Sequence, residues 1–470
     1  MLNRFAIFGL FVVLTPNAPV AAETEAPLAD AAAKNDRIAV QTLLQKRVDV
    51  NAAQVDGMTA LHWAVHLDDL ETAKLLVSAG ADAKAENRYG VTPIALACTN
   101  GNTAIVELLL DSGADPNTTL RGGETVLMTA ARTGKLGPVQ ALLARGADVN
   151  AEERKGQTAL MWAAAEGHVA VVDALIEAEA GFRTRLKSGF TPFFFAVREG
   201  RSGVVLRLLD AGIGVNDVMR PRFGRAAQAR ISPLLLAIEN GHFELALELL
   251  EAGADPNEQR IGYTALHAIS WVRKPIRGDG DPPPIGSGNV SSLQLVRQLA
   301  THGADVNARR KRQPAGRARL NMTDTTPFLL ASRTADIPLM RLLVELGADP
   351  LLSNADGCTP LMAAAGVGAL GDGDEAAATE TEALEAVKLL LELGADVNTR
   401  DANGETAMHG AAYKSWAKVV EFLAESGADA ALWNRKNKHG WTPQLIAEGH
   451  RPGNFRPSPE TLAALHHAMQ

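Results

Sequence analysis

Cysteine is scarce in this sequence, and long apolar segments are missing. Two cysteines among 470 residues cannot build a dense disulfide framework or a zinc site of four thiolates. No stretch of 18 apolar residues occurs, so the sequence predicts no membrane-spanning helix. Basic residues are not in excess either, because 46 of them face 54 acidic ones and leave a formal charge of −8. This balance argues against a general nucleic-acid binder, which needs a positive field to neutralise phosphates.

The N-terminus has the pattern of a secretory signal peptide. Arg4 provides a positive charge, and residues 5–14 form a short apolar stretch. Val20 and Ala22 stand at the small-residue positions before a cleavage site, so we predict cleavage between Ala22 and Glu23. Ten residues rise only about 15 Å as a helix, roughly half of a hydrocarbon layer, which argues against an uncleaved anchor. We expect export to the periplasm or the extracellular space, without stable membrane insertion after cleavage.

A period of about 33 residues organises the rest of the chain. Thr59 opens the phrase TALHWAV, and related phrases follow at this constant interval as far as Thr191. Thr326 and Thr359 open two more that are separated by the same interval. In total, related phrases start near residues 26, 59, 92, 125, 158, 191, 232, 264, 326, 359, 406 and 442. Self-similarity at a fixed period of this size predicts a repeat architecture of about twelve units.

A second motif keeps the same register. The letters GAD begin 21 residues after the opening threonine or serine at Gly80, Gly113, Gly146, Gly253 and other equivalent positions. With its TALH and TPL phrases, the chain resembles the ankyrin repeat family. The resemblance covers residues 23–470 and implies an all-α solenoid of stacked helix-turn-helix units with projecting β-hairpin-like fingers. We therefore expect one continuous solenoid in place of the two to four globular domains that the length alone suggests.

The residues of a single unit explain its expected local structure. The threonine or serine hydroxyl can cap the first helix, and a proline such as Pro93 fits the first helical position, where no amide donor is needed. Gly101 and its equivalents turn the chain, and Gly80 fits the left-handed end of the second helix. Each unit leaves one apolar face uncovered, so only stacking of units can bury it.

Four departures from the period predict enlarged surface loops. They lie near residues 216–230, 272–289, 309–320 and 366–380. The first and third enlarge fingers, whereas the second and fourth separate the two helices of a unit.

Basic residues concentrate in the predicted fingers. The third insertion begins with Arg309, Arg310, Lys311 and Arg312, whereas the fourth is acidic. Because the ankyrin resemblance places all fingers along one edge, it implies a positive edge on an acidic protein. One hypothesis is that this edge binds an acidic partner, and the alternative is that arginine keeps long exposed loops soluble.

Partner contacts in ankyrin-like stacks come from the finger tips and from the concave face just before the inter-helix turn. Tyr89, Trp271 and Tyr413 are the predicted anchors, because Trp, Tyr and Arg are enriched at binding hot spots. The predicted partner-binding residues are His66, Tyr89, Arg121, Arg132, Arg154, Lys155, Arg198, Trp271, Arg309, Arg310, Lys311, Arg312, Arg333 and Tyr413.

Catalytic and metal-binding motifs are not evident. His62 and His66 are four residues apart on a predicted helix, but neither an HExxH glutamate nor a third ligand accompanies them. His62 shares its position in the phrase with His267 and His409, where hydrogen bonding to backbone between units explains a histidine. The sequence also lacks a GxSxG nucleophile elbow, a Walker phosphate loop and a CxxC pair. We expect no enzymatic activity, metal or cofactor.

The sequence favours an exported, bacterial, monomeric scaffold or adaptor that binds a protein partner and no nucleic acid. Two alternatives stay open. One is an accessory or maturation factor for an exported enzyme, and the other is a secreted effector that acts on host proteins.

Overall fold

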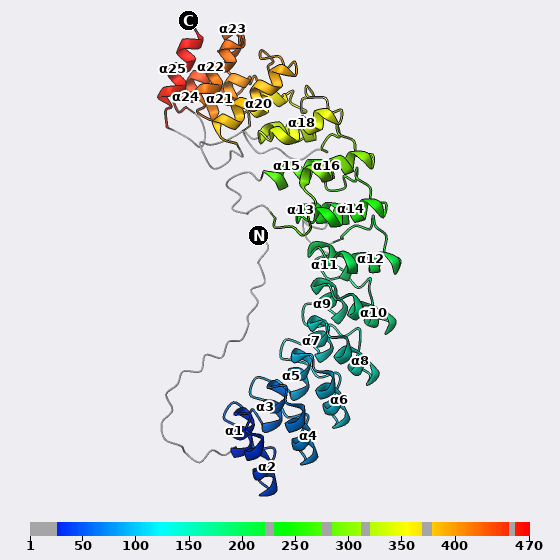
Figure 1. Cartoon of the computed structure of the whole chain (residues 1–470). Coiled ribbons are helices and arrows are strands. Elements are labelled where there is room, and N and C mark those ends of the chain that lie inside the picture. Colours follow the sequence, from blue (N-terminus) through cyan, green and yellow to red (C-terminus); the bar gives the residue numbers. More distant parts are fainter. Residues whose placement is uncertain (1–25, 221–229, 275–283, 312–319, 369–377, 451–455) are drawn as a thin grey trace. The chain divides into compact units, whose positions relative to one another are not determined.

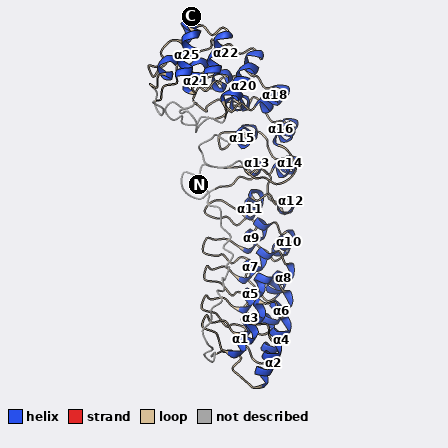
Figure 2. Ribbon diagram, turned by 60° about the vertical axis from the view of Figure 1, so that its left-hand side comes forward, coloured by secondary structure: helices blue, strands red, loops and turns tan. Residues whose placement is uncertain are grey.

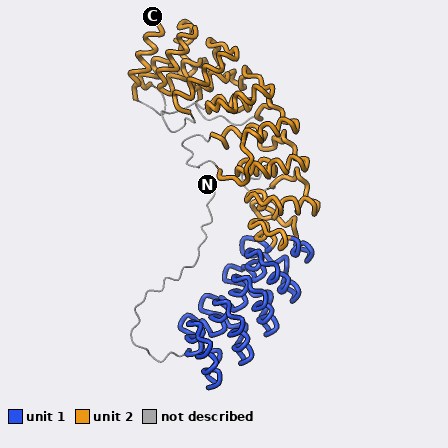
Figure 3. Tube along the Cα trace, in the orientation of Figure 1, with its two compact units in different colours: residues 1–159, 173–180 blue, residues 160–172, 181–470 orange. Residues whose placement is uncertain are grey.

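The computed structural model describes residues 26–220, 230–274, 284–311, 320–368, 378–450 and 456–470. The predicted signal peptide with its cleavage site at Ala22 and Glu23 lies outside these residues, and so do Arg312 and parts of the four insertions. The chain forms two compact units (Figure 3). Unit 1 comprises residues 1–159 and 173–180, and unit 2 comprises residues 160–172 and 181–470.

Helices follow one another in pairs, whose first member we call the inner helix and whose second we call the outer helix (Figure 1). The pairs of unit 1 are α1 (Pro27–Ala33) with α2 (Arg37–Gln45), α3 (Ala60–His66) with α4 (Leu70–Ser78), α5 (Pro93–Asn100) with α6 (Thr103–Asp111), and α7 (Val126–Thr133) with α8 (Leu136–Ala144). Inner helices pack on inner helices and outer helices on outer helices, as α3 does on α5 and α4 on α6. The helices α9 (Ala159–Glu166) and α10 (Val169–Glu177) contain residues of both units.

Unit 2 continues the same arrangement. Its pairs are α11 (Pro192–Arg198) with α12 (Ser202–Asp210), α13 (Pro233–Glu239) with α14 (Phe243–Glu251), α15 (Ala265–Arg273) with α16 (Ser292–Thr301), α17 (Pro327–Arg333) with α18 (Ile337–Glu345), α19 (Pro360–Ala364) with α20 (Glu380–Glu392), α21 (Ala407–Tyr413) with α22 (Ala417–Glu425), and α24 (Pro443–Ala447) with α25 (Pro459–Ala468). The short α23 (Ala430–Trp433) lies between α22 and α24.

The described residues are helices joined by turns and loops, with no β-strand (Figure 2). One isolated antiparallel bridge joins Thr119 and Thr125 at the base of a finger. This architecture confirms the predicted all-α class and the helix-turn-helix units. The fingers therefore keep their form through turns and side-chain hydrogen bonds more than through strand pairing.

The predicted helix caps are present. The hydroxyl of Thr92 accepts a hydrogen bond from the amide of Ala95, and those of Thr125, Thr191 and Ser232 accept in the same way. Such a side-chain cap satisfies one of the amides that a helix N-terminus leaves without a partner. Gly80 has the predicted left-handed conformation at the end of α4, with a φ of 92°, and the turn glycine Gly101 has a φ of 74°.

Buried histidines connect neighbouring units, as the TALH phrase predicts. The ring of His62 accepts from the Thr59 amide at Nδ1 and lies 3.0 Å from the Val91 carbonyl at Nε2. His267 and His409 repeat this arrangement with the carbonyls of Thr325 and Arg435. Burial lowers the pKa of His267 and of His409 to about 4, so both rings are neutral at pH 7.

An asparagine ladder also joins consecutive fingers, and the sequence analysis did not predict it. Asn117 donates to the carbonyl of Gly146 and accepts from the amide of Asp148. The same pair of bonds recurs at Asn51, Asn216, Asn257, Asn307 and Asn398. The signal in the sequence was the asparagine four residues after the GAD glycine, in phrases such as GADPN.

Candidate partner-binding surface

Two positions of each unit build the surface between the inner helices and the fingers. One is the residue directly before the helix cap, and the other is the seventh residue after the cap, near the end of the inner helix. In unit 2 the side chains at these positions meet: Phe190 lies against Arg198, Tyr263 against Trp271, and Glu405 against Tyr413. Three predicted binding residues, Arg198, Trp271 and Tyr413, therefore have a defined neighbour within their own unit.

Arg198 lies over two phenylalanine rings. Its guanidinium carbon is 5.0 Å from the ring centre of Phe190 and 5.2 Å from that of Phe195, within the range of a cation–π contact. Glu199 pairs with it at 2.7 Å. The side chain of Arg198 is 31% exposed. A partner could therefore contact both this cation and the aromatic surface beside it.

A second cluster lies around Trp271. The rings of Tyr263 and Trp271 meet edge to face at 4.8 Å, and the Tyr263 hydroxyl donates to Glu239. Burial raises the pKa of both Glu239 and Tyr263. Both rings remain partly exposed, as the prediction of Trp271 as a binding residue requires.

The prediction that Arg310 is an exposed residue of the finger edge is wrong. Arg310 is only 6% exposed, and its guanidinium carbon lies 5.2 Å from the Tyr263 ring and 5.6 Å from the Trp271 ring. Its backbone amide donates to the carbonyl of Thr325. Burial lowers the pKa of this guanidinium, and the two ring faces offset part of the cost of removing it from water.

The prediction that Tyr413 is an exposed anchor is also wrong. Tyr413 is 9% exposed and its hydroxyl donates to Glu405 at 2.9 Å, while the Asn437 amide donates to both of these residues. Burial raises the pKa of Glu405 to about 7. The hydrogen bond from Tyr413 opposes this shift, and the nearby charge of Asp401 adds to it. Tyr413 thus connects its helix to the next finger, and its phenol and the Asn437 amide both donate to one oxygen of the buried carboxyl group.

The remaining predicted residues of unit 2 differ in accessibility. Arg309 is exposed, but it donates to the carbonyls of Asp324 and Ser353 and so bridges its own finger to the next. Lys311 is exposed at the edge of the described segment, and Arg333 is half-buried.

The predicted residues of unit 1 lie on the exposed surface. His66 packs edge-on against Trp63 with ring centres 5.7 Å apart, and Arg132 is exposed at the corresponding end of α7. Tyr89 is 62% exposed at a finger tip. Arg121, Arg154 and Lys155 occupy the tips of the next two fingers, and all three are exposed.

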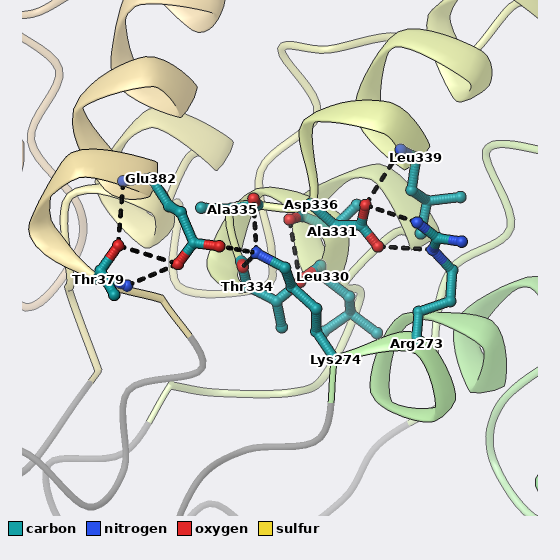
Figure 4. A network of polar contacts seen from close by, with 10 residues as sticks. All are labelled: Arg273, Lys274, Leu330, Ala331, Thr334, Ala335, Asp336, Leu339, Thr379 and Glu382. Carbon is teal, nitrogen blue, oxygen red and sulfur yellow. Dashed lines mark hydrogen bonds and ion pairs between the residues drawn. The ribbon is translucent and has the colours of Figure 1, made fainter. Parts of the chain in front are cut away.

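A polar network holds the ends of two insertions beside the inner helices of unit 2 (Figure 4). Arg273 makes two hydrogen bonds to Asp336, at 2.6 and 3.0 Å. Lys274 donates to the carbonyl of Ala335 and to Glu382, and this lysine is the main reason that the pKa of Glu382 falls to about 2. Lys274 lies at the start of one insertion and Glu382 directly after another, so the network fixes one end of each insertion.

Among the described residues, no three His, Cys, Asp or Glu side chains gather as a metal ion would require. No helix in the described part of the chain has the length and apolar character needed to cross a membrane.

The stacked helix pairs, their capped inner helices and their linked fingers define a helical-repeat protein of the kind that binds through a surface. Models of ankyrin repeats match residues 28–120, 127–219 and 375–455, and an ankyrin repeat model matches residues 230–260. These matches span more than half of the chain, which belongs to the ankyrin repeat family. The mouse B-cell lymphoma 3 protein homolog is 33% identical over 134 residues, which are 28% of this chain and 24% of that relative. The aligned part is thus about a quarter of the relative's length.

Proposed function

We propose that this protein is a non-enzymatic scaffold or adaptor of about twelve ankyrin repeats that acts after export from a bacterial cell. It binds a protein partner through the inner-helix surface and the fingers. The observation that carries this proposal is the pair of half-exposed aromatic and cationic clusters around Arg198 and Trp271, because both residue types are enriched at binding hot spots. Membership of the ankyrin repeat family supports a binding role, since such repeats present extended surfaces.

Crosslinking in intact cells, followed by mass spectrometry of the captured proteins, tests the binding role. We expect Arg198→Ala and Trp271→Ala each to reduce capture of the partner about tenfold or more, the scale of a hot-spot residue. Leu206→Ala is the matched control, because Leu206 is exposed on the outer helix α12. Circular dichroism checks that each variant keeps its helices. Equal capture by all three variants would remove the inner-helix surface from the proposal.

Cell fractionation tests where the protein acts. Retention in the periplasm supports an adaptor or an accessory factor for an exported enzyme, whereas release into the medium supports an effector that acts on host proteins. Recovery of the uncleaved chain from the cytoplasm would contradict the exported role.

A further inference from the structure

Three consecutive fingers of unit 1 carry an arginine at the same tip position. Arg88, Arg121 and Arg154 are each separated from the next by one repeat period, and each side chain is exposed. Tyr89 and Lys155 follow directly in two of these tips and are exposed as well. The tips thus present one guanidinium per repeat.

Hydrogen bonds fix these tips relative to one another. The tips close in the same way, because Gly90, Gly123 and Gly156 each donate to the carbonyl three residues earlier. Arg121 also reaches back to the preceding finger and donates to the Arg88 carbonyl at 2.5 Å. The next tip is equally close, since a Cβ on Gly123 would lie 3.4 Å from the Arg154 amide nitrogen. The arginines therefore repeat at the spacing of the stacked units and do not extend independently from long loops.

The charges of this row are incompletely neutralised. The side chains of Arg88 and Arg154 make no hydrogen bond or ion pair with the described residues. The exposed Glu86 and Glu152 lie two residues before them and reduce the local positive field. Glu153 is engaged with the backbone amides of Lys155 and Gln157, where it closes its own turn.

We infer that the Arg88, Arg121 and Arg154 row binds an extended acidic segment of the protein partner, in the polyproline II conformation, with one carboxylate in every three residues. Packed helix layers lie roughly 8 to 10 Å apart. A polyproline II turn contains three residues and rises about 9 Å, so every third side chain faces the same way at the spacing of the tips. A β-strand would place residues i and i+3 on opposite faces. An α-helix repeats its face after seven residues and about 10.5 Å, just beyond that spacing.

The inference deepens the proposed partner-binding function, on which it rests, by naming the chemistry that the finger tips recognise. Fluorescence anisotropy of the full-length purified chain with synthetic peptides tests it. The probes are a dodecapeptide of four Glu-Pro-Pro triplets and a dodecapeptide of the same composition whose four glutamates are contiguous. We expect the triplet peptide to bind more tightly at low salt and to lose most of its affinity at about 0.2 M salt, because exposed ion pairs are screened.

Matched variants separate the tips from general electrostatics. We expect the triple variant Arg88→Gln, Arg121→Gln and Arg154→Gln to weaken binding of the triplet peptide about tenfold, since each exposed ion pair contributes about a factor of two. Lys46→Gln, Lys74→Gln and Lys135→Gln remove the same charge from exposed positions away from these tips and should leave binding within twofold. Circular dichroism confirms that both triple variants are folded.

Several outcomes would overturn the inference. Equal affinity for the two peptides would reject the three-residue spacing, and equal weakening by both triple variants would reject the finger tips as the site. Tighter binding of a helical peptide with glutamate at every seventh residue would reject the conformation, and tighter binding of a twelve-nucleotide single-stranded DNA would reject a protein segment. Because these measurements need no cellular partner, their failure is distinct from a failure of the crosslinking experiment on Arg198 and Trp271.

Discussion

Glu179 adopts a backbone conformation that favours glycine. Its φ is 65°, and it stands where Gly113 and Gly146 end the outer helices of other units with φ of 92° and 82°. A side chain in this left-handed region crowds its own backbone, which costs roughly 1 to 2 kcal/mol. The departure from the GAD motif at this position, visible in the sequence, thus corresponds to local strain.

We expect Glu179→Gly to raise the free energy of unfolding by about 0.5 to 1 kcal/mol, because glycine relieves the strain but loses more chain entropy on folding. Urea denaturation monitored by circular dichroism measures the change. Gly146→Ala is the matched reverse variant, since a Cβ there would meet nothing within 4 Å and only the backbone conformation opposes it. It should destabilise the protein by about 1 kcal/mol. A lower free energy of unfolding in Glu179→Gly would show that backbone strain at this residue is not the dominant effect.

The ionisation of Glu405 is coupled to folding. Glu405 is 6% exposed, and the pKa of its carboxyl is about 7 in the folded chain against an ordinary value of 4.5. Between these values the unfolded chain loses the proton and the folded chain keeps it. The stabilisation that this group contributes is therefore fully present below pH 4.5, and it disappears as the pH rises through 7.

We expect Glu405→Gln to match the wild type at low pH and to be more stable above pH 7, by up to about 3 kcal/mol. The glutamine can still accept hydrogen bonds from Tyr413 and Asn437, but it never ionises. Thermal unfolding at pH 4.5, 6 and 8 measures the difference. Glu425→Gln on the exposed side of α22 serves as control and should show no such trend. A pH-independent difference at Glu405 would contradict the coupling.

The asparagine ladder is the device that links one finger to the next. Where asparagine is replaced, the link changes. Arg183 takes its place and donates to the Gly212 carbonyl, whereas the side chain of Leu351 cannot donate, and Leu351 is 47% exposed. The stack therefore tolerates the loss of a single link, because each repeat is also held by helix packing against the neighbouring repeats.

We expect Asn307→Ala to lower the free energy of unfolding by about 1 to 2 kcal/mol, because it removes the bonds to the Gly347 carbonyl and the Asp349 amide. Leu351→Asn should raise it by about 1 kcal/mol, since the new side chain would reach the equivalent groups of Gly394 and Asp396. Hydrogen exchange should show both effects within the adjoining repeats. A uniform change along the chain, or no gain from Leu351→Asn, would contradict a local link.

At the scale of the whole molecule, each repeat contacts mainly the repeats next to it. This predicts that the cooperativity of unfolding is limited along the chain. Five of the six tryptophans belong to unit 2, and Trp63 alone belongs to unit 1. We expect tryptophan fluorescence and far-ultraviolet circular dichroism to give urea midpoints that do not coincide, because fluorescence reports chiefly on unit 2 and helix content on both units. The variant Trp63→Phe is the control and should leave the fluorescence midpoint unchanged. Coincident transitions would show that the chain unfolds as one cooperative body.

The sequence alone was sufficient for the repeating features. The threonine and serine caps, the turn glycines and the histidines of TALH lie where the repeat period predicts, because each acts through the backbone of its own unit or the next. Accessibility was harder to predict, since it depends on which neighbours cover a side chain. Arg198 and Trp271 remain partly exposed, whereas Tyr413 is covered by the following finger.

The family and the all-α architecture were thus determined by the sequence itself, because local capping and turn chemistry recur in register and leave stacking as the only way to bury the apolar faces. Only the tertiary structure decided which surface residues are available to a partner. Arg310 and the exposed Arg88 are both arginines of fingers, yet Arg310 lies over the rings of Tyr263 and Trp271. Such contacts join residues about 40 to 50 positions apart across the insertion near residues 272–289, where the repeat period of the sequence no longer applies.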